Sequence, residues 1–139
     1  MADTTRISNA TATAEADIVA GYLDNGYLRI YDSTGGTGQP ATVDTAIGSQ
    51  VLLAELRFAN PSDAGAANGV ITFSGLTADP SANATGTASW FRAFKSDGTT
   101  AVWDGSVGTA GATLNLNTTS IVSGATVSVT SLTYTVNKG

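Results

Sequence analysis

The sequence of 139 residues contains no cysteine and no histidine. The lack of cysteine excludes a disulfide framework and any thiol nucleophile. The lack of histidine removes the usual general base near neutral pH and the commonest metal ligand, so zinc sites and Ser-His or Cys-His catalysis are excluded. A carboxylate pair or a calcium site with oxygen ligands is still compatible with this composition. We expect a protein that is not an enzyme and needs no cofactor or metal.

Charged residues are also scarce, at 12% of the chain against about 25% in an average soluble protein. The net charge is −5 and no basic cluster is present, so we expect no nucleic-acid partner. No apolar run approaches the ~20 residues of a membrane span, and we expect no signal peptide after Met1. Thr, Ser, Asn, Ala and Gly take the place of charges, as in the neutral β surfaces common in viral shells and fibres.

Residues 87–107 (TASWFRAFKSDGTTAVWDGSV) predict a β-hairpin at the centre of the core. Asp97-Gly98 is a strong hairpin signal, because glycine tolerates the positive φ that a tight turn needs. The arms carry both tryptophans, and large aromatic side chains dominate the burial energy of a small domain. The hairpin residues that we expect in the core are Trp90, Phe91, Phe94, Val102 and Trp103.

Two registers are open for this hairpin. A two-residue turn at Asp97-Gly98 places Arg92 opposite Trp103, whereas a type I turn followed by a bulge at Gly98 places Phe91 opposite Trp103. We favour the second register because it brings apolar side chains of both strands together on one face of the hairpin. That face consists of Trp90, Phe94 and Val102. Apolar groups remain on the opposite face in both registers, so we expect cover on both sides, from a second sheet, a helix or a partner chain.

A single helix is predicted over residues 12–23. Thr11 or Thr13 can cap its start, and Asn25-Gly26 is a plausible stop. The apolar stripe at i, i+4 spacing consists of Ala14, Ile18 and Tyr22, with Val19 beside them. Because a short helix persists only when it packs on something, we expect this stripe to face the rest of the domain.

Residues 1–10 are polar and lack periodicity. They form either a floppy terminus or an arm that becomes ordered on a neighbouring subunit. The arm residues that we expect to contact a partner are Thr4, Thr5, Arg6 and Ile7.

Short alternating segments fill the chain between residues 26 and 136. Besides the hairpin, the strands are predicted at 27–31, 51–59, 69–77, 112–117, 121–122 and 124–136. Gly75 is a possible bulge, and a change of phase in the last strand predicts a bulge at Thr130-Ser131. Together these segments predict one all-β domain over residues 1–139, a jelly-roll-like β-sandwich with one short N-terminal helix.

Acidic residues offer few candidate sites. The aspartates that we expect at strand ends or in loops, where the side chain accepts local backbone hydrogen bonds, are Asp32, Asp44, Asp63, Asp79 and Asp104. None has the spacing of a calcium loop. Glu55 and Arg57 are expected as neighbours on an exposed face. Arg92 could make a cation–π contact with the aromatic rings around it. We favour an Arg92 that lies along the edge of the sandwich or pairs with Asp104.

Several segments resemble small virion proteins of tailed bacteriophages and prophages. They are residues 27–32 (YLRIYD), 52–58 (LLAELRF), 85–104 and 108–136. In particular they are similar to capsid cement, or decoration, proteins. The resemblance implies a jelly-roll subunit on the outer surface of the capsid that ties neighbouring capsomers together.

Three function hypotheses follow from residues and resemblance together. A capsid cement protein leads, with the major capsid protein and itself as partners. A homodimer is favoured and a trimer is the alternative, because a clip must contact two capsomers and twofold self-association is the commonest way to become bivalent. A tail or baseplate structural protein comes second. A carbohydrate-binding β-sandwich module comes third and would need aromatic side chains on an exposed face.

Overall fold

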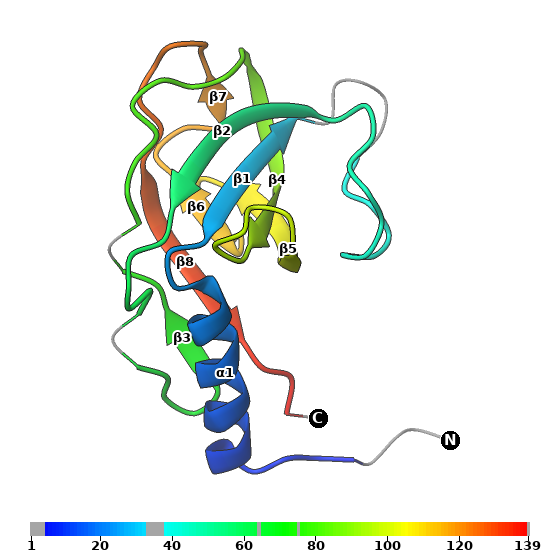
Figure 1. Ribbon diagram of the computed structural model, residues 1–139, viewed down its shortest axis with the longest axis vertical. Helices are drawn as coiled ribbons and strands as arrows, with labels where there is room; N and C mark the ends of the chain where they lie inside the picture. Colours follow the sequence, from blue (N-terminus) through cyan, green and yellow to red (C-terminus); the bar gives the residue numbers. More distant parts are fainter. Residues whose placement is uncertain (1–4, 33–37, 64, 75, 139) are drawn as a thin grey trace.

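The computed structural model describes residues 5–32, 38–63, 65–74 and 76–138. Within them the chain forms one helix, α1 (Asn9–Leu23), followed by eight strands (Figure 1). The strands are β1 (Tyr27–Asp32), β2 (Val51–Arg57), β3 (Val70–Thr72), β4 (Gly86–Phe94), β5 (Ala101–Gly108), β6 (Leu114–Leu116), β7 (Ser120–Ile121) and β8 (Val129–Thr135). The prediction of an all-β fold with one short helix is confirmed. No helix in the described part of the chain is long and apolar enough to cross a membrane.

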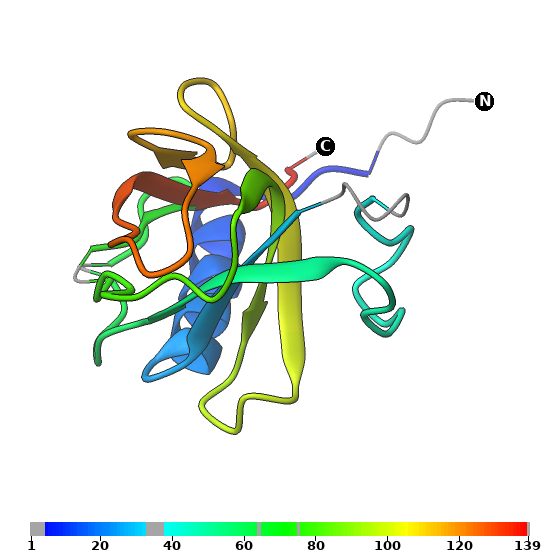
Figure 2. The ribbon, with the colours of Figure 1, turned by 90° about the horizontal axis from the view of Figure 1, so that it is seen from above.

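The strands join into one sheet in the order β2-β1-β4-β5-β6-β8-β3, with β7 paired to β4 beside this path. All pairs are antiparallel except β5 with β6. The sheet turns sharply where β6 follows β5, and Figure 2 shows β8 running across the direction of β4 and β5. The two parts of the sheet therefore face each other in a sandwich-like arrangement, with α1 packed along β3 and β5.

The core lies between the two parts of the sheet. Strand β1 alternates as its sequence predicts, with Leu28 and Ile30 fully buried on the inner face. Burying one such side chain contributes roughly 1.5–3 kcal/mol relative to leaving it exposed. The other large side chains that are almost completely buried in this core are Leu53, Leu56, Ile71, Phe91, Leu114, Leu116 and Leu132.

Next to its loop the hairpin of β4 and β5 has the register that a two-residue turn at Asp97-Gly98 predicts, with Phe94 opposite Ala101, but beyond that pair neither predicted register holds. Arg92 lies opposite Asp104, and Trp103 lies opposite Ala93. Residues 96–99 form the loop, closed by the N–H of residue 95 donating to the carbonyl of residue 100 (2.9 Å). The register shifts after Ala93, so Val102 is the extra residue of a bulge. The bulge moves every later pair by one residue, which turn chemistry alone does not predict.

The hairpin also divides its aromatic residues between two faces. Phe91 and Trp103 face the core with their rings edge to face, 4.9 Å apart. Trp90 and Phe94 are buried on the opposite face. The bulge residue Val102 instead packs against the core cluster. The predicted grouping of Trp90 and Phe94 with Val102 on one face is therefore wrong. Both faces are covered, as expected. Figure 2 shows α1 on one side of β4 and β5 and the segment after residue 37 on the other.

Helix α1 begins earlier than predicted, because Ser8 rather than a threonine caps it. The Ser8 hydroxyl accepts a hydrogen bond from the N–H of Thr11 (3.1 Å). The end is as predicted: Asn25 has a φ of 60°, and the N–H of Gly26 donates to the carbonyl of Leu23 (2.7 Å). Asparagine and glycine are the residues that most readily follow a helix in this way.

The buried face of α1 is the opposite of the predicted one. Its buried residues are Ala12, Ala16, Ala20 and Leu23. The predicted stripe faces solvent, with Ile18 56% and Tyr22 48% exposed. The reason is a close approach of backbones: a methyl group added at Gly69, just before β3, would lie only 2.7 Å from the Ala12 Cβ. Only small side chains fit between a helix and a chain this close.

The later strands are shorter than their sequence segments. The predicted strand at 69–77 is regular only at β3, and Gly75 lies outside the described residues. The predicted bulge in the last strand is confirmed, because Asn115 pairs with Ser131 while Leu116 pairs with Val129, which leaves Thr130 as the extra residue.

Gly105 tests the packing at the centre of the hairpin. A methyl group at this position would lie 2.5 Å from Cε1 of Phe91 and 3.2 Å from the Thr113 side chain. We expect Gly105→Ala to lower the stability by about 1–3 kcal/mol through overpacking, measured by urea unfolding. Gly48→Ala is the control, since its nearest neighbour would be 3.6 Å away. Equal midpoints for the two variants would contradict this account.

Candidate functional site

Four charged residues form a row across the outer face of β2, β1, β4 and β5. Glu55 pairs with Arg29, Arg29 with Arg92, and Arg92 with Asp104 in the strand register. The signs therefore run negative, positive, positive, negative. Arg29 Nε donates to Glu55 Oε2 (2.7 Å), and Arg92 donates two hydrogen bonds to the Asp104 carboxylate (2.6 and 2.9 Å). The two arginines are neighbours in this row, and the carboxylate on the outer side of each one compensates its charge.

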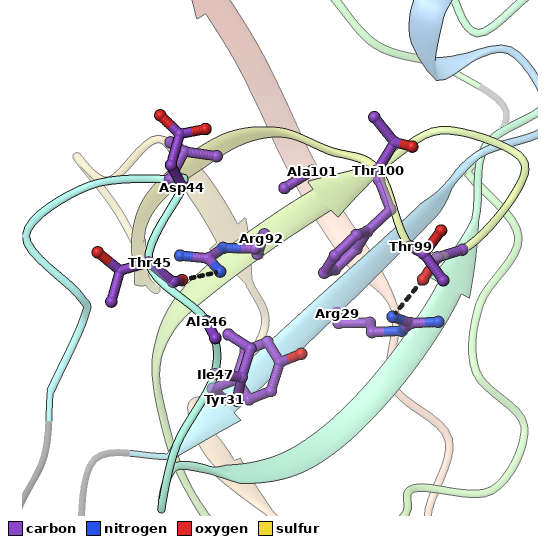
Figure 3. A pocket seen from close by; sticks show the side chains of 13 residues that line it. Arg29, Tyr31, Asp44, Thr45, Ala46, Ile47, Arg92, Thr99, Thr100 and Ala101 are labelled. Carbon is purple, nitrogen blue, oxygen red and sulfur yellow. Dashed lines mark hydrogen bonds between the residues drawn. The ribbon is translucent and has the colours of Figure 1, made fainter.

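The Arg92–Asp104 pair is almost completely buried, with 3% and 4% of the two side chains exposed. The segment of residues 38–50 covers it and supplies further acceptors. Arg92 donates to the backbone carbonyls of Thr45 (2.7 Å) and Thr42 (3.3 Å). Figure 3 shows the bond to Thr45 beneath the covering loop. Of the two favoured positions for Arg92, the structure has the pair with Asp104. The expected place of Asp104 at a strand end is wrong, because it lies within β5.

Aromatic rings surround the two arginines on this face. Tyr31 and Trp90 stack with ring centroids 4.6 Å apart, and the Arg92 guanidinium lies 5.5 Å from the Trp90 ring. The Arg29 guanidinium lies 4.5 Å from the Phe94 ring. Burial raises the pKa of Tyr31 above its ordinary value. These rings are covered rather than presented to solvent, since Trp90 is only 1% exposed and Tyr31 and Phe94 are also buried.

An open pocket of about 620 Å³ remains between the covering segment and the hairpin loop. Figure 3 shows Asp44 and Thr45 on one side of it and Thr99 and Thr100 on the other, with Arg29 at the base. Both arginines already have carboxylate partners, so the pocket offers no unpaired guanidinium to an anion. In the described part of the chain, no group of three His, Cys, Asp or Glu residues could hold a metal ion.

Two of the five candidate aspartates have the local role that their sequence positions predict. Asp63 accepts from the N–H of Gly65 (3.1 Å), and Asp79 accepts from the N–H of Ser81 (2.9 Å). Asp32 accepts from a backbone N–H at the start of β4 (3.1 Å). Asp79 also accepts from the N–H of Glu55 (2.9 Å), which caps the outer edge of β2. Such a bond covers backbone groups that an edge strand otherwise presents.

Glu55 and Arg57 share the outer face of β2, as predicted, but they do not pair with each other. The Glu55 carboxylate bonds to Arg29 across the sheet, while Arg57 donates to the carbonyl of Asn25 (2.9 Å) and lies over the Tyr27 ring. Both arginines therefore serve contacts between elements rather than a free charged surface.

Sequence reasoning missed the turn carboxylate Asp97 and the cover of Arg92. Asp97 accepts from the hydroxyl and N–H of Thr100 and from the N–H of Thr99, and these bonds lower its pKa to about 2. The Asp-Gly pair signalled that turn. The carbonyls that hold Arg92 carry no sequence signal, because every residue has one.

The predicted arm is shorter than residues 1–10. Thr4 lies outside the described residues, and Thr5 and Arg6 are exposed. Ile7 is partly buried, and its N–H donates to the carbonyl of Lys138 (3.1 Å). Ile7 therefore belongs to the folded domain, and the segment that can act as an arm ends at Arg6.

Comparison with protein-family models, with curated proteins and with solved structures finds no match to this chain. The geometry of the described residues and the resemblance given above therefore carry the functional argument.

Substitutions of Asp104 and Arg92 test the buried pair. Asp104→Ala leaves the charge of Arg92 buried without its carboxylate, which typically costs about 3–5 kcal/mol of stability. Glu55→Ala is the matched control, because its pair with Arg29 is partly exposed and such pairs contribute about 0–1 kcal/mol. We expect Arg92→Leu with Asp104→Leu to cost less than Asp104→Ala in urea unfolding. Equal losses for Asp104→Ala and Glu55→Ala would show that burial does not distinguish the pairs.

Proposed function

We propose that this protein is a structural component of a phage virion that decorates the outside of the head and ties neighbouring capsomers together. One observation carries the proposal: α1 packs its alanines inward and turns Ile18 and Tyr22 to solvent. Full burial of an apolar side chain of this size contributes a free energy of roughly 1.5–3 kcal/mol relative to full exposure. A helix that presents its largest apolar groups outward suits a protein whose partners are other proteins.

The build of the outer face supports the same role. The buried ion pair, the stacked rings and the covering segment hold β1, β4 and β5 rigidly. The exposed surface around them is rich in threonine and serine hydroxyls, which can bond to a neighbouring protein without desolvating a charge. The resemblance of residues 85–104 and 108–136 to capsid cement proteins adds the head as the place of action.

In this proposal the partners are the major capsid protein and a second copy of this chain, with a trimer as the alternative to the dimer. A bivalent clip gains through effective concentration, often by a factor of about 10²–10⁴. The protein acts without catalysis, cofactor, nucleic acid or membrane.

The two other hypotheses receive less support. A tail or baseplate protein could have the same kind of all-β fold, and only its place of binding would distinguish it from a head protein. A carbohydrate-binding module needs accessible rings for stacking on sugars, whereas Trp90, Tyr31 and Phe94 are buried beneath the covering segment.

Mixing the purified protein with isolated heads and isolated tails of its source phage tests the proposal. We expect saturable binding to heads that lack the protein, visible by co-sedimentation and as added density in electron micrographs. Heads already carrying the protein are the control and should take up little. Binding to tails alone would favour the second hypothesis, and binding to neither would refute both.

The same assay tests the arm. Deletion of residues 2–6 leaves Ile7 and the helix cap Ser8 in place, and the melting temperature of the free variant is measured as a control. We expect heads decorated with this variant to lose it at lower temperature or salt stress than heads with the full chain. Unchanged retention would show that the arm makes no contact.

A further inference from the structure

We propose that the outer face of α1 is a twofold interface on which a second copy of this chain packs its own α1 in antiparallel orientation. The inference rests on the proposed function for its purpose, which is to make a bivalent clip. The face consists of Ala14, Glu15, Ile18, Gly21 and Tyr22. These positions follow the helical repeat on the side opposite to the buried alanines.

Gly21 is the first sign that another backbone approaches here. It lies within α1, and a methyl group at this position would meet nothing within 4 Å. Glycine inside a helix costs about 0.5–1 kcal/mol relative to alanine. No neighbouring atom within the subunit explains why a glycine is found at this position. At Gly69, in contrast, a side chain would collide with the Ala12 side chain. A missing side chain on an exposed helix face allows a neighbouring helix to come close.

The face is complementary to itself in shape. In an antiparallel pair with a twofold axis at Ile18, residues whose numbers sum to about 36 face each other across the axis. The pair then brings Ala14 of one copy beside Gly21 of the other, where both are small. Along the other edge of the interface, Tyr22 extends over the first turns of the opposing helix. Small residues therefore meet on one side and a large ring fills the other.

The face is also complementary in charge. Lys95 lies over the ring of Tyr22 in its own subunit, 4.1 Å from the centroid. The twofold pairing brings that ammonium group toward Glu15 of the other copy. Among the described residues Glu15 has no salt bridge, whereas its helix neighbours Asp17 and Asp24 accept backbone hydrogen bonds from the segment before β3. Each interface would thus contain two such Glu-Lys pairs.

The position of α1 suits a clip. Figure 1 shows the helix at one end of the molecule, with β7 and the loops around it at the other. Two subunits joined through α1 would therefore direct their far ends away from each other. Such a body can contact two capsomers, which a monomer with one contact surface cannot do.

Sedimentation equilibrium of the free protein tests the interface without any capsid. We expect the wild type to associate to twice its mass of 13.9 kDa. Ile18→Glu places two charges at the axis, and we expect it to weaken association by at least about tenfold. Val122→Glu is the matched control, since Val122 is 57% exposed against 56% for Ile18 and lies beyond α1. We expect it to associate as the wild type does.

Charge reversal identifies the partner and the orientation. Glu15→Lys and Lys95→Glu should each weaken association by about two- to fivefold, and the double variant should recover it. Circular dichroism of every variant checks that α1 is intact. A wild type that stays monomeric, or a dimer that Ile18→Glu leaves unchanged, would overturn the inference. If a protein that forms no such dimer still binds heads, the proposed function holds and only the interface is refuted. If the dimer forms but binds no heads, the interface holds and the proposed function is refuted.

Discussion

The outer face of the sheet depends on how the buried charge of Arg92 is compensated. A guanidinium taken out of water needs a carboxylate and further hydrogen-bond acceptors around it. Asp104 meets the first need only when it lies directly opposite on β5. A slip of one residue would turn Asp104 to the other face of the sheet and leave Arg92 unpaired. This requirement outweighs the grouping of apolar side chains and accounts for the bulge at Val102.

The same charge positions the segment of residues 38–50. Two of its carbonyls accept hydrogen bonds from Arg92, so the segment lies across β4 and β5. It thereby buries Tyr31, Trp90 and Phe94. The protein gains a rigid outer face whose rings are out of reach of a ligand.

Helix α1 illustrates a second constraint, which is the distance between backbones. The chain before β3 passes so close to the start of the helix that a methyl group added at Gly69 would lie only 2.7 Å from the Ala12 Cβ. The larger residues of the helix must then face outward, where a monomer has no use for their apolar area. The buried alanines and the exposed apolar side chains of α1 are therefore two results of the same packing of the helix against the chain before β3.

Local pattern alone determined much of this fold. Alternation placed Leu28 and Ile30 on one face of a strand, and the phase change in the last strand located the bulge at Thr130. The Asp-Gly pair located the hairpin, and charge and proximity indicated the bond between Arg92 and Asp104. These features depend on backbone periodicity and on short-range turn chemistry, which are properties of neighbouring residues.

Only the tertiary structure decided which face of α1 is buried, the register of the hairpin and the cover over Arg92. Periodicity shows which residues share a face, but it does not show which face meets the core. The stripe of Ala14, Ile18 and Tyr22 exists as the sequence suggests, yet the closeness of Gly69 to the helix turned it outward. Backbone carbonyls such as that of Thr45 leave no mark in a sequence, because their use depends on where distant parts of the chain meet.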